Sequence, residues 1–433
     1  MGFLDRLVAV ERSEIKPMLW AALYYFLLLA AYFVIRPIRD EMGVAGGVRN
    51  IPWLFLGTLV GMLLVHPLFT ALVSRVPRRI FIPASYTFFA LNLASFWLLF
   101  QAVSGNSNIW AGRVFFVWTS VFNLFVVSIF WSLMADAFRP EQAKRLFGFV
   151  AVGGTVGAVF GSSITAFLAE RISPTNLLLV SAALLGLAML AAHQLMRTAP
   201  RQDAEDIPVS DTTSEQPVGG GVLDGIRTAL SSPYLLGIVG YMLLYTITAT
   251  FLYLLQAEVV SANISDRAAQ TVFFARIDLT VNSLTAIIQI FLTGRIVRRI
   301  GVALALATLP LVCVIGFAAL GVAPTLMAIA VFQVLRRTSN YAIARPCREM
   351  LYTVLPRDAK YKAKNFIDTF IYRFGDQVGA WSYWAVGAAG LGAAAISLVA
   401  LPLSVTWLFV GLWLGRRQKV LARETSTLGK TPG

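Results

Sequence analysis

The segment A-P-R-Q-D-A-E-D-I-P-V-S-D-T-T-S-E-Q-P-V-G-G-G at 199–221 divides this 433-residue chain into two nearly equal parts. It is the only long stretch of the sequence that is polar and rich in Pro, Gly and Ser. Such a composition is typical of a flexible linker, because it offers few apolar side chains to bury. We therefore expect a first half at 1–198, a linker at 199–221 and a second half at 222–433.

On both sides of this linker the chain consists of apolar stretches of about 20 residues, the length that a helix needs to cross a bilayer. Apolar residues make up 58% of the sequence and the mean hydropathy is +0.72, which excludes a water-soluble fold. We predict an all-α membrane protein with twelve transmembrane helices, six in each half. The expected spans are 17–38, 51–73, 80–101, 109–135, 146–169, 175–196, 233–257, 270–293, 301–320, 324–346, 365–388 and 395–415.

The formal net charge of +14 follows the positive-inside rule rather than a nucleic-acid-binding pattern. Basic residues gather at alternate ends of the expected helices, as Arg75, Arg78, Arg79, Lys144, Arg145, Arg295, Arg298, Arg299, Arg357, Lys360, Lys362, Lys364, Arg416, Arg417 and Lys419. The loops expected on the other face, at 102–108, 319–324 and 389–395, carry no charge. We therefore expect the linker and both termini in the cytoplasm, and no nucleic-acid partner.

Residues 1–16 lack an apolar core and mix acidic with basic residues, so they resemble neither a signal peptide nor a transit peptide. Direct insertion of the first helix is the expectation.

The two halves resemble each other in sequence. S-R-V-P-R-R at 74–79 has a counterpart in G-R-I-V-R-R at 294–299, and P-E-Q-A-K at 140–144 has one in P-R-D-A-K at 356–360. The two pairs are separated by nearly the same number of residues. Two six-helix halves with an Arg-rich turn after the second helix of each resemble the major facilitator superfamily. The resemblance implies a solute site between the halves, near the middle of the bilayer, and alternating access to it.

Ionisable residues inside the expected spans are the sharpest functional signal, because such residues usually face a cavity or a charged partner. The candidates lie within or at the end of four of the expected helices. The first has Arg36, Arg39 and Asp40, the eighth Arg276 and Asp278, the tenth Arg336 and Arg337, and the eleventh Asp368, Arg373 and Asp376.

Two interpretations of these charges stay open. Arginine forks bind phosphate or carboxylate oxygens bidentately, so a cluster with too few acidic partners favours an anionic substrate. Alternatively, the charges pair internally, as Arg373 could with Asp376, and hold helices together. Asp278 and Asp376 are then interhelical partners, or protonatable groups that couple transport to a proton gradient. Adjacent residues point about 100° apart on a helix, so we expect only one of Arg336 and Arg337 to face a cavity.

Other patterns do not indicate a cofactor, a metal site or catalysis. Gly153, Gly157 and Gly161 repeat every four residues, which is typical of close helix packing rather than of a phosphate loop. Cys313 and Cys347 lie far apart and lack metal-ligand spacing. No nucleophile, base and orienting group occur with a recognisable spacing, so an enzyme is not expected.

Three segments resemble the ATP/ADP translocase family of plastids and obligate intracellular bacteria. I-R-P-I-R-D at 35–40 is similar to the family's L-R-D-x-K-D, and E-Q-A-K-R-L-F-G at 141–148 to its E-A-K-R-F-Y. C-R-E-M-L-Y-T-V-L-P-R-D-A-K-Y-K-A-K-N-F-I-D at 347–368 resembles its C-K-E-x-A-Y followed by K-x-K-G-K-A-A-I-D, without a gap.

This resemblance implies that Arg39, Glu349 and Lys364 stand at positions involved in nucleotide binding and exchange. The chain departs from the family at Gln142, in place of Glu, and at Asp376, in place of Lys. The second departure replaces a cation with an anion, and a pocket with this change holds a triphosphate less well. The resemblance therefore implies a relative of the translocases.

We therefore hypothesise a bacterial inner-membrane transporter that carries an organic anion, phosphorylated or nucleotide-like, by alternating access. The predicted substrate-binding residues are Arg36, Arg39, Arg276, Arg336, Arg337, Glu349, Lys364 and Arg373, and the predicted coupling or ion-pair residues are Asp40, Asp278, Asp368 and Asp376. The expected partners are a small anionic solute and membrane lipids, and the expected state is a monomer. The alternatives are a proton-coupled carrier of another solute, such as an amino acid, peptide or siderophore, and a non-transporting sensor or scaffold.

Overall fold

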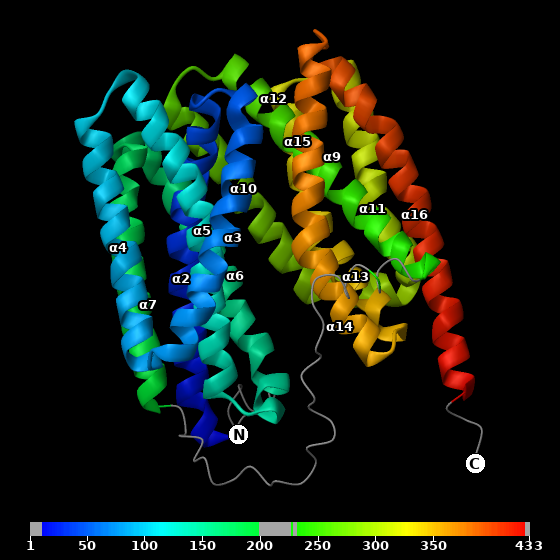
Figure 1. Cartoon of the computed structure of the whole chain (residues 1–433), viewed down its shortest axis with the longest axis horizontal. Coiled ribbons are helices and arrows are strands. Elements are labelled where there is room, and N and C mark those ends of the chain that lie inside the picture. The colour runs from blue at the N-terminus through cyan, green and yellow to red at the C-terminus, as the bar shows by residue number, and fades with distance from the viewer. Residues whose placement is uncertain (1–10, 199–226, 228–231, 429–433) are drawn as a thin grey trace. The chain divides into compact units, whose positions relative to one another are not determined.

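Helices form almost the whole of the computed structural model, which describes residues 11–198, 227 and 232–428 (Figure 1). Six long helices precede residue 199: α2 (Arg12–Ala45), α3 (Ile51–Arg75), α4 (Arg78–Ala102), α5 (Gly105–Ala137), α6 (Pro140–Ile172) and α7 (Leu177–Thr198). The later helices are α9 (Pro233–Asn263), α10 (Arg267–Phe291), α11 (Thr293–Val322), α12 (Leu326–Ser339), α13 (Arg345–Leu351), α14 (Arg357–Phe366), α15 (Tyr372–Ala388) and α16 (Ala393–Leu428). Short 3₁₀ turns are η1 (Val48–Asn50), η2 (Pro174–Asn176) and η4 (Tyr352–Val354).

Each of the twelve expected spans lies almost entirely within helical segments, which confirms the prediction of an all-α membrane protein. Among the described residues, ten helices are long and apolar enough to cross a membrane. The two expected spans that fall outside this group are the tenth and eleventh, which contain most of the intramembrane charge. Both are interrupted by π-helical turns: η3 (Asn340–Ala344) joins α12 to α13, and η5 (Ile367–Ile371) joins α14 to α15.

The chain forms two compact units, and each is considered by itself. The first comprises Met1–Pro208 with Ile264–Asn282, and the second comprises Val209–Asn263 with Ser283–Gly433. The beginning of α10 thus packs with the first unit, although it belongs to the second half in sequence. The linker expected at 199–221 lies outside the described residues, so the predicted boundaries of the halves stay a prediction.

In the first unit the glycine stripe of α6 packs directly against the backbone of α2. A Cβ at Gly153, Gly157 or Gly161 would overlap the backbone carbonyl group of Ala22, Phe26 or Ala30, respectively. Glycine is therefore the only residue that allows this approach of the two helices. The prediction of a packing stripe at these positions agrees with this contact.

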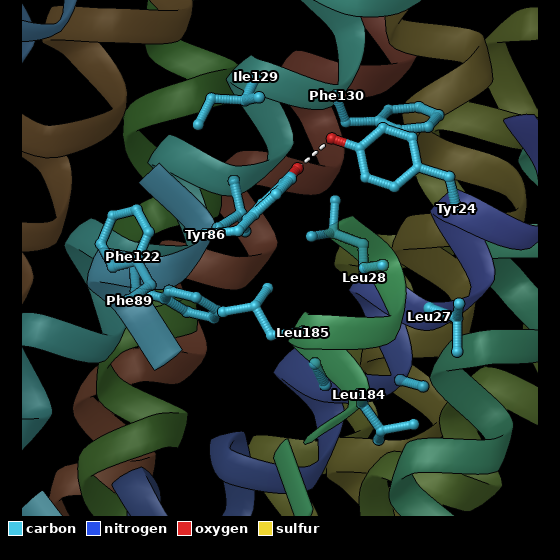
Figure 2. Close-up of a cluster of buried hydrophobic side chains, with 14 of the residues drawn as sticks. Tyr24, Leu27, Leu28, Tyr86, Phe89, Phe122, Ile129, Phe130, Leu184 and Leu185 are labelled. Atoms are coloured by element: carbon cyan, nitrogen blue, oxygen red, sulfur yellow. Dashed lines mark hydrogen bonds between the residues drawn. The ribbon is translucent and has the colours of Figure 1, made fainter. Parts of the chain in front are cut away.

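Aromatic and aliphatic side chains from α2, α4, α5 and α7 fill the core of the first unit. Figure 2 shows Tyr24 of α2 and Tyr86 of α4 joined by a hydrogen bond between their hydroxyl groups, close to Ile129 and Phe130 of α5. Both tyrosines are almost fully buried. The hydrogen bond satisfies two hydroxyl groups that would otherwise be costly to bury.

The second unit uses the same packing device between α15 and α9. A Cβ at Gly375 would overlap the side chain of Thr246, and one at Gly379 would press on Ile247 and Thr250. Gly375 and Gly379 were not predicted from the sequence, although the G-x-x-x-G spacing in α15 repeats the spacing in α6. Close backbone contact therefore fixes α15, with its charged residues, against α9.

Candidate functional site

The π-turn η3 follows directly after the two arginines of α12. The N–H group of Arg345 donates to the carbonyl oxygen of Asn340, five residues back instead of the four of an α-helix. In η5 the N–H group of Tyr372 donates to Ile367 in the same way. Single π-turns inside α-helices occur frequently at functional sites. The two interrupted helices are thus the place to look for a site in the second unit.

Arg336 is buried inside the second unit, with only 6% of its surface exposed. Within the described residues no carboxylate oxygen lies within 4.0 Å of its guanidinium group, and its Nε and Nη2 atoms have no hydrogen-bond partner. The neighbouring Arg337 is only half-buried. A buried arginine with free donors requires an acceptor, because an uncompensated charge is costly inside a membrane protein.

The ring of Tyr245, on α9, lies beside this arginine. The guanidinium carbon of Arg336 is 5.4 Å from the ring centroid, and that of Arg348, on α13, is 5.5 Å from it. The side-chain amide of Asn340 donates to the Tyr245 hydroxyl at 3.1 Å. Tyr372, the residue after η5, lies with its ring centroid 6.1 Å from that of Tyr245. Residues from both interrupted helices therefore meet on one tyrosine.

Arg348 and Tyr245 were not among the site residues predicted from the sequence. Arg348 precedes Glu349 in the C-R-E segment, so its position next to a predicted site residue was the available signal. Tyr245 gives no signal in the sequence, because a tyrosine in an apolar helix is common.

Arg373 and Asp376 of α15 form an ion pair, as one of the two interpretations expected. Their closest nitrogen and oxygen atoms are 3.5 Å apart, and the hydroxyl of Thr250 donates to the other Asp376 oxygen, also at 3.5 Å. Both distances are long for hydrogen bonds. Arg373 therefore has a carboxylate partner that Arg336 lacks in the described part of the chain.

In the first unit Arg36 of α2 pairs with Asp278 of α10. The Nη1 atom of Arg36 is 2.9 Å from an Asp278 oxygen, and only 2% of the Asp278 side chain is exposed. A second pair between the same helices joins Arg267 to Glu41, with an Nε–oxygen distance of 2.5 Å. This second pair was not predicted from the sequence, because both residues lie beyond the expected helix ends. Two ion pairs thus hold α10 against α2.

Arg39 contacts both a carboxylate and an aromatic ring. Its Nη1 atom lies 3.4 Å from an oxygen of the adjacent Asp40, and its guanidinium carbon lies 4.0 Å from the centroid of Phe116. The ring of Phe116 and the carboxylate both stabilise the cation. Arg39 is therefore held in place by protein groups of the first unit.

The remaining predicted residues do not all join these clusters. Glu349 and Lys364, which the family resemblance singles out, form an ion pair with each other. Asp368 is exposed but lies within electrostatic range of Arg348, Lys364 and Glu349. Arg276 is exposed on α10. Among the described residues, Arg276 therefore does not join the clusters around Arg336 and Arg36, and its assignment to the site stays a prediction.

Side chains that commonly bind metal ions do not gather in the residues that the structure describes. They contain no group of three or more His, Cys, Asp or Glu that could hold a metal ion. Cys313 and Cys347 are both buried and unbridged.

Long apolar helices, an internal repeat and charged residues within two interrupted spans define the class of polytopic membrane transporters. The chain belongs to the Major Facilitator Superfamily, whose family model matches residues 18–348. This membership confirms the predicted transporter class and the predicted absence of an enzyme activity.

The most informative relatives are carriers from chlamydiae and plants. ADP,ATP carrier protein 1 of Chlamydia muridarum is 22% identical, over 86% of this chain and 82% of its own length. ADP,ATP carrier protein 1 of Arabidopsis thaliana chloroplasts is 20% identical, over 87% of this chain and 69% of its own length. These matches confirm the resemblance to ATP/ADP translocases that the sequence motifs indicated.

Among solved structures, the D323A mutant of the nucleoside transporter NupG superposes with a TM-score of 0.64. The alignment covers 92% of this chain and 99% of the NupG chain, at 14% sequence identity. This likeness establishes the shared fold.

Proposed function

We propose that this protein is a secondary transporter of the bacterial inner membrane that carries a phosphorylated or nucleotide-like organic anion by alternating access. The observation that supports this most directly is Arg336, a buried cation whose free donors have no carboxylate in reach within the described residues. An anionic solute supplies the missing acceptors. The relatives named ADP,ATP carrier protein support the same solute class, since both nucleotides are polyanions.

Exchange is the mode that fits this proposal best. In an exchanger the site faces first one side of the membrane and then the other, and it carries an anion in each direction. The cationic site is therefore occupied during both changes of conformation. The names of the chlamydial and plant relatives, which pair ADP with ATP, favour the same mode.

The proton-coupled alternative requires a carboxylate that exchanges protons readily. Asp278 is held by Arg36 at 2.9 Å, and Asp376 has Arg373 and Thr250 beside it. Each carboxylate thus has a neighbouring arginine as its ion-pair partner. These pairings favour a structural role for both aspartates. A sensor or scaffold has no use for the free donors of Arg336.

The cellular arrangement that we propose follows the charge distribution of the sequence. The two halves, 1–198 and 222–433, are joined by a cytoplasmic linker at 199–221, and both termini face the cytoplasm. The functional unit is a monomer surrounded by membrane lipids.

Counterflow in proteoliposomes tests the proposal. Vesicles that contain the purified full chain are loaded with an unlabelled compound and then offered the same compound in labelled form. The panel comprises ADP, AMP, a hexose phosphate, citrate, adenosine and an amino acid. We expect accumulation of at least one phosphorylated compound without an imposed proton gradient, and none of adenosine or the amino acid. Uptake of only neutral compounds, or uptake that requires a proton gradient, would contradict the proposal.

A further inference from the structure

We propose that Arg336 and Arg348 together form a subsite for a phosphoryl group of the solute, and that the Tyr245 ring positions both arginines through cation–π contacts. This inference rests on the proposed function and deepens it, because it assigns the part of the solute that the second unit binds. Arg348 is a new member of the site.

The π-turn η3 is what brings these two arginines to the same side of the interrupted helix. Arg348 lies twelve positions after Arg336. In a continuous α-helix that spacing would leave the directions in which the two side chains point about 120° apart. The π-turn takes up one additional residue, as the bond from Arg345 to Asn340 indicates. The remaining eleven steps each turn the chain by the α-helical angle of about 100°, so the directions of the two side chains differ by only about 20°. The interruption therefore aligns Arg336 with Arg348.

The contacts of Tyr245 are consistent with this alignment. Both guanidinium carbons lie within 5.5 Å of its ring centroid, inside the range of a cation–π interaction. The hydroxyl group accepts a hydrogen bond from Asn340, which lies one turn beyond Arg336 within η3. The ring thus stabilises two cations that would otherwise repel each other, and its hydroxyl group ties it to the π-turn.

The positive charges of the two arginines beside Tyr245 favour binding of an anion. Neither guanidinium group has a carboxylate within 4.0 Å in the described chain. Two acidic residues lie at longer range: Asp376 pairs with Arg373 and also lies within electrostatic range of Arg336, and Asp368 lies within electrostatic range of Arg348 and Lys364. The pair Arg336 and Arg348 therefore presents positive charge that no carboxylate of the described chain neutralises by direct contact.

A phosphoryl group matches this pair better than a carboxylate does. A phosphate monoester carries a charge of about −1.5 to −2 at pH 7 and has three acceptor oxygens. It can therefore neutralise both arginines and accept from each. A carboxylate carries a single charge and its two oxygens satisfy one arginine fork.

The competing interpretation is that Arg336 only holds helices together. It lies beside Cys313 of α11 as well as Tyr245, so it contributes packing in either case. A structural arginine changes the melting temperature when it is replaced, whereas a binding arginine changes the response to ligand. The two roles are therefore distinguishable.

Ligand-induced stabilisation of the purified full chain tests the subsite, with inorganic pyrophosphate, ADP and citrate as probes and adenosine as the uncharged control. The variants are R336Q, R348Q, R336K and R348K. R345Q is the matched control, because Arg345 lies on the same short helix but is exposed. We expect R336Q and R348Q each to weaken pyrophosphate and ADP binding at least 10-fold, since each removes a charge-assisted hydrogen bond to the ligand. The lysine variants retain the charge and should lose less, and R345Q should bind like the parent chain.

The outcomes separate this inference from the proposed function. If R348Q binds pyrophosphate and ADP as tightly as R345Q does, the subsite is wrong, while an anion carrier remains. Citrate binding without any phosphate binding likewise overturns the subsite and leaves the anion carrier. If the parent chain binds no anion in the panel, the proposed function fails and the subsite with it. Should R336Q melt early, the same comparison is made with R336K.

Discussion

The arginines of the described helices differ in what neutralises them. Arg36 and Arg373 each have a carboxylate partner, and Arg39 lies between a carboxylate and a ring. Arg336 and Arg348 share only a tyrosine ring within the cation–π range. Residues with the same sequence context, an arginine inside an apolar span, therefore have different chemistry.

Replacing Arg36 tests the paired group. In R36Q the carboxylate of Asp278, which is nearly fully buried, loses the Arg36 guanidinium group, and breaking a buried pair from one side costs about 3–5 kcal/mol of stability. We expect an early melting transition in detergent, and partial recovery in the double variant R36Q/D278N. R276Q is the control. Arg276 lies on α10, two residues before Asp278, but it is exposed, so its replacement should change the stability by less than about 0.5 kcal/mol. A parent-like melting temperature for R36Q would assign this arginine to the solute instead.

The charged residues within the spans could be identified from the sequence, but which of them form ion pairs with each other could not. Arg36 and Asp278 are 242 residues apart, and no local pattern links them. Arg267 and Glu41 were overlooked because both lie beyond the ends of the expected helices. The pair Arg373 and Asp376 could be anticipated, since residues three apart on a helix are neighbours.

At the scale of helices, apolar length predicts the position of a span but not its interruptions. Long apolar runs gave helix positions to within a few residues for most of the spans, because each must satisfy its backbone polar groups within itself. The π-turns η3 and η5 have no such signature. They depend on how the charged helices pack, which a single sequence does not reveal.

The glycine stripe of α6 gives a first test at this scale. In G157L the new side chain would collide with the backbone of Phe26 on α2, and the two helices would have to separate. We expect a loss of at least about 1–3 kcal/mol, or failure to fold, without any change in charge. G186L is the control, since a Cβ at Gly186 on α7 meets nothing within 4 Å. Equal yields and melting temperatures for the two variants would show that the stripe is not a tight contact.

Deleting one residue from η3 gives a second test. Removal of Ile343 should convert the π-turn into an ordinary α-helical turn. Because the additional residue is the one removed, Arg336 and Arg348 keep their common direction, and pyrophosphate binding should fall no more than a few-fold. Deleting Leu351, beyond both arginines, is the control for the cost of a shortened chain. A complete loss of binding in the Ile343 deletion, with folding intact, would mean that the π-turn itself contributes to the site.

At the scale of the whole molecule, the two halves share a plan that the sequence discloses only in part. The Arg-rich turns and the P-x-x-A-K segments repeat between the halves, and the structure adds a repeated glycine contact, α6 on α2 and α15 on α9. The two halves differ in their interrupted helices, because both π-turns found in the described chain lie in the second unit. The two halves therefore share a framework, and the π-turns of the described chain are a feature of the second unit alone.

Membrane orientation is the remaining prediction, and the chain is well suited to a cysteine-accessibility experiment. Its two cysteines, Cys313 and Cys347, are both buried, so the background labelling should be low. Single cysteines would be introduced at Ser104 and Leu391, in the uncharged loops, and at Pro77 and Glu424, next to the Arg-rich ends. All four positions are exposed.

The positive-inside rule gives opposite expectations for the two pairs of sites. In intact bacterial cells a membrane-impermeant maleimide should label cysteines at 104 and 391 and should leave those at 77 and 424 unlabelled. Permeabilised cells should show labelling at all four. A cysteine at 104 that is protected in intact cells and labelled after permeabilisation would place that loop in the cytoplasm. The twelve-span topology would then be wrong, because α4 and α5 would cross the membrane in the opposite direction from the one the basic residues require.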